Sequence, residues 1–146
     1  MTDAATHEAA HVIAALVEKA PIEGVTLIPK SSEWSGHLVL DQQWSGMVVQ
    51  NEDLAGYEAN CVIRLASFAL DQMTEQPETG ALDDVQWAVE RIRRFFPDRK
   101  ETIVSRARQI VDEHYDAIVE LGVLLHERRE LSAVEIAEFW KGRGEK

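Results

Sequence analysis

Residues His7, Glu8 and His11 form an H-E-x-x-H pattern inside a mostly apolar run over residues 4–17. On a helix, residues four apart project from the same face, so both imidazoles can reach one metal ion. Two neutral His nitrogens suit Zn²⁺, and the pattern places Glu8 beside the open position where water sits. Zinc lowers the pKa of that water to about 7, and Glu8 would take its proton as general base. The pattern predicts a zinc hydrolase; the alternative is a helix that carries two histidines by coincidence.

A zinc site of this type needs a third protein ligand, and two aspartates open a helix that we expect over residues 79–96, before Pro97. On a helical wheel Asp83 falls in the polar face, whereas Asp84 falls at the margin of the apolar stripe. A carboxylate at that margin is costly to desolvate unless it is paired or metal-bound. Asp84 is therefore the better candidate ligand. The alternative is a helix-start carboxylate that pairs with an arginine or with backbone N–H groups.

The hydrophobic periodicity of the whole chain predicts a mainly α fold with a small β-sheet. The expected elements are a helix capped by Thr2 or Asp3 that ends at about residue 19, strands over 22–29 and 36–40, and helices over 54–73, 79–96, 99–129 and 132–140. The two strands are expected to pair antiparallel or at an edge. Ser132 and Glu135 form a capping box for the last helix, with Leu131 and Ile136 at the staple positions.

Three further histidines lie outside the H-E-x-x-H pattern. We expect His37 to be a surface or half-buried residue, and His114 and His126 to be surface residues, because neither of the last two has a ligand-spaced partner nearby.

Length and composition predict one domain that covers residues 1–146. The chain is 45% apolar, which is typical of a globular protein, and its net charge of −11 argues against nucleic-acid binding. Cys61, the single cysteine, lies in an apolar helical stretch and is expected to be buried. No disulfide can form within the chain, so we expect a reducing, cytoplasmic location. No signal peptide is expected, because the first six residues carry no basic region and the apolar run contains His7, Glu8 and His11. No membrane span is expected, because no uninterrupted apolar run approaches about 18 residues.

The motifs, taken in chain order, resemble the peptidase domain of the FtsH-type ATP-dependent zinc proteases. Thr6-His-Glu-Ala-Ala-His11 and Val25-Thr-Leu-Ile-Pro29 resemble the family's H-E-A-G-H helix and V-x-x-I-P strand. Thr79-Gly-Ala-Leu-Asp-Asp84 resembles its T-G-A-x-N-D turn, and residues 114–136 resemble its paired C-terminal helices. The resemblance implies that His7, His11 and Asp84 bind zinc and that Glu8 is the base.

The chain also departs from this family. Ala10 stands where the family has Gly, and the segment between the Asp84 helix and the C-terminal helices is shorter. No G-x-x-x-x-G-K-[ST] phosphate loop occurs, so no ATPase module is expected.

The leading hypothesis is therefore a stand-alone zinc metallopeptidase that acts on peptides or unfolded proteins. A peptidase-like binding or regulatory module without catalysis is the alternative from another functional class. A helical domain that binds no metal is a weaker third hypothesis. The sequence does not determine the oligomeric state.

Overall fold

The computed structural model describes residues 4–27, 37–40, 54–74 and 82–144, and it confirms a mainly helical fold with a small sheet. In chain order the elements are α1 (Ala4–Val17), β1 (Ile22–Thr26), β2 (His37–Leu40), α3 (Leu54–Met73), α4 (Leu82–Phe95), η1 (Pro97–Arg99), α5 (Lys100–Glu113), α6 (Tyr115–Arg128), β3 (Glu130–Ser132) and α7 (Ala133–Gly142). The proposed caps Thr2 and Asp3 lie outside these ranges, as do Thr79 and the side chain of His37.

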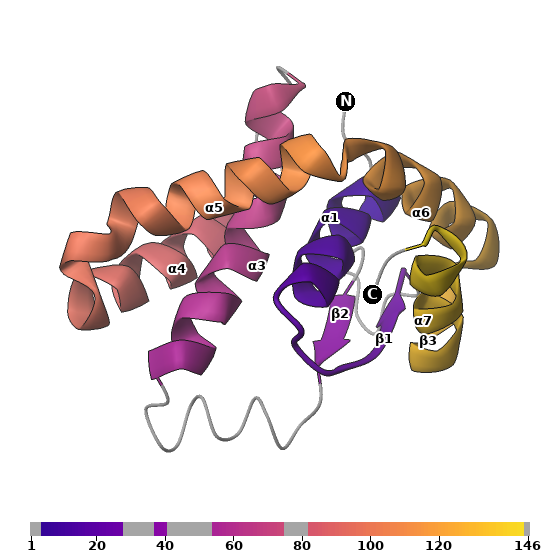
Figure 1. The fold of residues 1–146 in the computed structure, drawn as a ribbon, viewed down its shortest axis with the longest axis horizontal. Helices are drawn as coiled ribbons and strands as arrows, with labels where there is room; N and C mark the ends of the chain where they lie inside the picture. Colours follow the sequence, from indigo (N-terminus) through magenta and orange to yellow (C-terminus); the bar gives the residue numbers. More distant parts are fainter. Residues whose placement is uncertain (1–3, 28–36, 41–53, 75–81, 145–146) are drawn as a thin grey trace.

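Helix α1 is the central element. Figure 1 shows it between α3 on one side and α6 on the other, with the sheet beside its C-terminal half. Eight consecutive residues, 8–15, are buried, and the alanines among them let neighbouring helices approach closely. Ala9, Ala10 and Ala14 have no exposed surface. Because α1 is packed on nearly all sides, the H-E-x-x-H motif sits on a rigid element.

The sheet has three strands in the order β2-β1-β3, and both pairings are antiparallel. The β1–β2 pairing was expected from the sequence, whereas β3 was not. Gly24 in β1 pairs with Ser132, and a Cβ on Gly24 would lie 3.0 Å from the carbonyl oxygen of Leu131. The absence of a side chain at Gly24 therefore permits β3 to pair at this distance.

The C-terminal helix begins as its sequence predicts. The backbone N–H of Glu135 donates to Ser132 Oγ at 3.2 Å, and the N–H of Ser132 donates to Glu135 Oε1 at 3.0 Å. Leu131 and Ile136, at the staple positions, are both buried in the core. The capping box is confirmed, and Ser132 is at once the last residue of β3 and the N-cap of α7.

The single helix expected over 99–129 is wrong: the chain breaks it at His114 into α5 and α6. His114 has φ −116° and ψ 23°, outside the helical region. The apolar positions continue at helical spacing through the break, and neither Gly nor Pro marks it. The two halves nevertheless pack on different partners, α5 on α3 and α6 on α1, which requires a change of direction (Figure 1).

The two histidines expected at the surface differ in environment, and the expectation is wrong for His114. His126 is exposed, as expected. His114 is half-buried, and its ring centroid lies 5.5 Å from that of Trp140 in α7.

Among the described helices, none combines the length and the apolar character needed to cross a bilayer.

Candidate metal centre

Three side chains from two helices converge at one point, next to the first turn of α1. Nε2 of His7 lies 3.1 Å from Nε2 of His11. Asp84 Oδ2 lies 3.1 Å from His11 Nε2 and 3.6 Å from His7 Nε2. The structure thus brings together the three residues that the sequence predicts as metal ligands, although Asp84 is 73 positions from His11.

The triangle formed by these atoms has the dimensions of a zinc site. A tetrahedral zinc with bonds of about 2.0–2.1 Å holds its ligand atoms about 3.3–3.4 Å apart. The observed separations of 3.1, 3.1 and 3.6 Å lie on both sides of that value. Two imidazoles and one carboxylate are also the donor set of catalytic zinc sites that keep an open fourth position. Geometry and donor chemistry therefore both fit Zn²⁺.

His11 is held by its second ring nitrogen. Its Nδ1 lies 2.8 Å from the backbone carbonyl oxygen of Ile63 in α3, and a carbonyl can only accept, so Nδ1 carries the proton. Nε2 is then the atom directed at His7 and Asp84. Burial lowers the pKa of His11, but the hydrogen bond with Asp84 and the charges of Glu8 and Asp84 outweigh burial and raise that pKa above its ordinary value.

Glu8 lies beside the donor atoms. The residue is buried, 6% exposed, and its Oε1 lies 3.8 Å from His7 Nε2. A general base must reach the proton that it abstracts, directly or through one water molecule. Glu8 lies close enough to the donor atoms to be the candidate for such a base.

Asp84 lies in the first turn of α4, and its two oxygens have different partners. Oδ2 faces the two histidines, while Oδ1 accepts a hydrogen bond from Nη1 of Arg64 at 3.3 Å. Burial raises the pKa of Asp84, but the bonds to His11 and His7 and the charge of Arg64 hold it well below the usual range. The structure thus confirms the arginine pairing of Asp84, and the ligand role of its other oxygen stays a prediction. The side chain of Asp83 lies outside the described residues.

Sequence reasoning did not find Ile63 or Arg64. The carbonyl of Ile63 leaves no trace in the sequence, because every residue has one. Arg64 does leave one: it is the only charged residue between Glu58 and Asp71 in an otherwise apolar helical stretch. A lone arginine in such a stretch indicates a specific partner.

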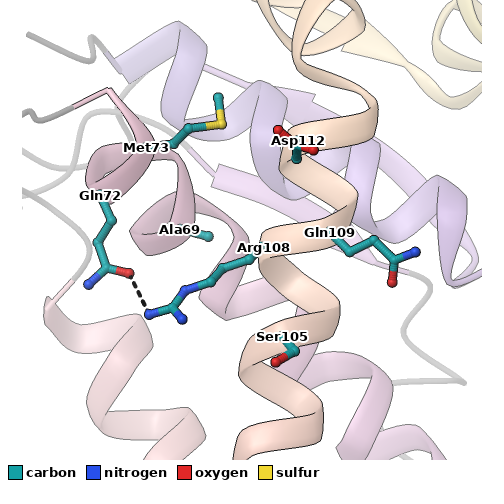
Figure 2. A pocket seen from close by; sticks show the side chains of 7 residues that line it. All are labelled: Ala69, Gln72, Met73, Ser105, Arg108, Gln109 and Asp112. Atoms are coloured by element: carbon teal, nitrogen blue, oxygen red, sulfur yellow. Dashed lines mark hydrogen bonds between the residues drawn. The ribbon is translucent and has the colours of Figure 1, made fainter.

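A groove of about 690 Å³ lies elsewhere, between α3 and α5. Figure 2 shows the side chains that line it, and Arg108 spans it to donate to Gln72 at 3.2 Å. The lining includes Met73 and Asp112 but none of the metal-centre residues. The groove is therefore separate from the three candidate ligands.

The sequence matches no protein-family model, and no curated protein matches it either. The residues and their geometry therefore carry the functional argument.

Proposed function

We propose that this chain is a zinc-dependent metallopeptidase of the type that the FtsH-like motif order suggests. The observation that carries the proposal is the convergence of His7 Nε2, His11 Nε2 and Asp84 Oδ2 beside the carboxylate of Glu8. When bound there, zinc would polarise the scissile carbonyl and make a water molecule acidic enough to attack at neutral pH. The chain's own residues supply the other requirements of hydrolysis.

The residues have separate roles in this proposal. His7, His11 and Asp84 hold the ion, and the carbonyl of Ile63 keeps His11 in the tautomer whose Nε2 can bind it. Glu8 takes the proton from the attacking water and returns it to the leaving amine. Glu8 and His11 are buried, whereas the side chains of His7 and Asp84 are 13% and 18% exposed, which leaves the donor atoms a side open to water and substrate.

The proposed substrates are short peptides, flexible segments and unfolded proteins. They need no ATP-driven unfolding, and the 146 residues contain no phosphate-loop motif. The lone buried thiol of Cys61 suits a reducing compartment, so we place the activity in the cytoplasm.

The test is to replace Glu8 with Gln and to measure both zinc content and cleavage of an unfolded casein-like substrate. We expect Glu8→Gln to retain zinc and to lose at least about 100-fold in cleavage rate, the lower range for removal of a general base. Glu18→Gln is the matched control, because Glu18 comes directly after α1 and pairs with Arg106 instead of lying beside the candidate ligands.

Chelation separates the alternatives. Cleavage by the wild type that disappears with a chelator and returns with zinc supports the peptidase. A zinc-loaded wild type that forms stable complexes with unfolded chains and cleaves none of them would overturn it in favour of a binding module.

A further inference from the structure

Two adjacent residues of α3 each support one residue of the metal centre. The carbonyl of Ile63 accepts from Nδ1 of His11, which comes from α1, at 2.8 Å. Nη1 of Arg64 donates to Oδ1 of Asp84, which comes from α4, at 3.3 Å. One turn of α3 thus holds both His11 and Asp84 by the atoms that face away from the proposed metal position, Nδ1 and Oδ1.

The guanidinium of Arg64 is itself held in place. Its Cζ lies 4.3 Å from the ring centroid of Trp87, one turn after Asp84 on α4. Arg91, one further turn along, places its Cζ 4.4 Å from the same ring and its Nη1 3.5 Å from the carbonyl oxygen of Trp87. A planar guanidinium stacks on an indole and keeps its N–H groups in a fixed plane, which an ammonium cannot do.

Arg64 occupies this place at a cost. Its Nε is buried and has no hydrogen-bond partner among the described residues. An unsatisfied buried N–H costs free energy, so the position has to be stabilised by another contact. Among the described residues, the guanidinium donates to Asp84 Oδ1 and stacks on the ring of Trp87.

We propose that Arg64 is a positioning residue that fixes Asp84 as a ligand through one oxygen. By engaging Oδ1, it leaves Oδ2 directed at the point where His7 and His11 converge. Without Arg64 the carboxylate is free to rotate and to offer either oxygen. The inference rests on the proposed zinc site, because it assigns the way in which one ligand of that site is oriented.

The test compares Arg64→Met with Arg106→Met. Met keeps a long apolar chain against Trp87 and removes the guanidinium. Arg106 is a matched control: its side chain is 43% exposed and pairs with Glu18, while that of Arg64 is 37% exposed. Zinc affinity is measured by competition with a chromophoric chelator, and the visible absorption spectrum of the Co²⁺-loaded protein reports the coordination geometry.

We expect Arg64→Met to weaken zinc binding about 10–100-fold, the usual effect of losing an outer partner of a ligand, and to change the Co²⁺ spectrum. Arg106→Met should leave both unchanged. Folded Arg64→Met with wild-type zinc affinity and an unchanged Co²⁺ spectrum would overturn the inference while leaving the zinc site intact. A wild type that binds no zinc would instead overturn the proposed function.

Arg64→Lys covers the case in which Arg64→Met does not fold. It retains the positive charge beside Asp84 but lacks the flat, stacked fork, so we expect a zinc affinity below that of the wild type, by less than the roughly 10–100-fold expected for Arg64→Met. Wild-type affinity in Arg64→Lys would show that the guanidinium is not needed and would overturn the inference.

Discussion

His11 donates its Nδ1 proton to the backbone carbonyl oxygen of Ile63 across 2.8 Å, although the two residues lie 52 positions apart. This bond determines which nitrogen of His11 can bind a metal, since the neutral ring then has its lone pair on Nε2. Nε2 is the nitrogen that faces His7 and Asp84. Packing of α1 on α3 therefore selects the tautomer that the proposed metal centre requires.

Asp84 should be required for zinc binding, whereas its neighbour Asp83 should not. Asp84→Ala removes one of three proposed ligand atoms, so we expect its zinc affinity to fall by more than the roughly 10–100-fold typical of outer partners. Asp83→Ala is the control, because the helical wheel places Asp83 on the polar face of α4. Isothermal titration with zinc distinguishes the two. Equal losses in both variants would contradict the assignment of Asp84.

Gly122 in α6 should control the position of the first turn of α1. A Cβ at Gly122 would lie 3.1 Å from Thr6 Oγ1 and 3.3 Å from Thr6 Cα, and Thr6 directly precedes His7. Gly122→Val would push the two helices apart, and overpacking of this kind costs about 1–3 kcal/mol. We therefore expect a lower unfolding free energy and weaker zinc binding, measured by denaturant titration and chelator competition.

Gly142 provides the comparison for this substitution, since a Cβ there meets nothing within 4 Å. Gly142→Val should change neither the unfolding free energy nor zinc binding. Normal zinc binding in Gly122→Val would mean that the first turn of α1 does not depend on α6.

The thiol of Cys61 should make the protein less stable at alkaline pH. Burial raises the pKa of Cys61 to about 12 in the folded chain. In the unfolded chain a thiol ionises near pH 8.5, about its ordinary value. Between these values only the unfolded state loses the proton, so stability declines as pH rises from about 8.5 towards 12.

Denaturant titrations at several pH values test this effect against Cys61→Ala, which should lose less stability over the same range. The native thiol should also resist alkylation at neutral pH and react once the protein is unfolded. If the unfolding free energies of the wild type and Cys61→Ala fell equally with pH, the effect would not come from the Cys61 thiol.

Asp71 in α3 should destabilise the fold through its charge. The residue is 1% exposed, and neither carboxylate oxygen has a hydrogen-bond partner among the described residues. An isosteric amide removes the charge and keeps the shape, so Asp71→Asn should raise the unfolding free energy, because an unpaired buried charge costs more than an unpaired buried amide. Thermal and denaturant unfolding measure this change.

Asp112→Asn is the corresponding control, because Asp112 is exposed and the change there should stay within about 0.5 kcal/mol. Destabilisation by Asp71→Asn would indicate that the carboxylate has a partner that contributes to stability.

Local patterns predicted the parts of the fold that depend on neighbouring residues. The limits of α3 follow from a long amphipathic segment, and the start of α7 follows from the capping box of Ser132 and Glu135. Such features depend on residues within a few positions of each other. The break at His114 was missed because the periodicity continues through it, and the direction of α6 depends on its contact with α1.

The strand β3 was missed for a similar reason. Three residues are too few for an alternating pattern, and their pairing depends on Gly24, more than a hundred positions earlier.

The sequence by itself determined the chemical components of the proposed centre. His7 and His11 share a helix face because their spacing is close to one turn, and Asp84 stood out because a carboxylate beside an apolar stripe needs a partner. Only the tertiary structure decided how they are held: the carbonyl of Ile63 orients His11, and Arg64 engages the outer oxygen of Asp84. Helical periodicity specifies which face a side chain occupies, but contacts between residues far apart in the chain arise only when the helices pack.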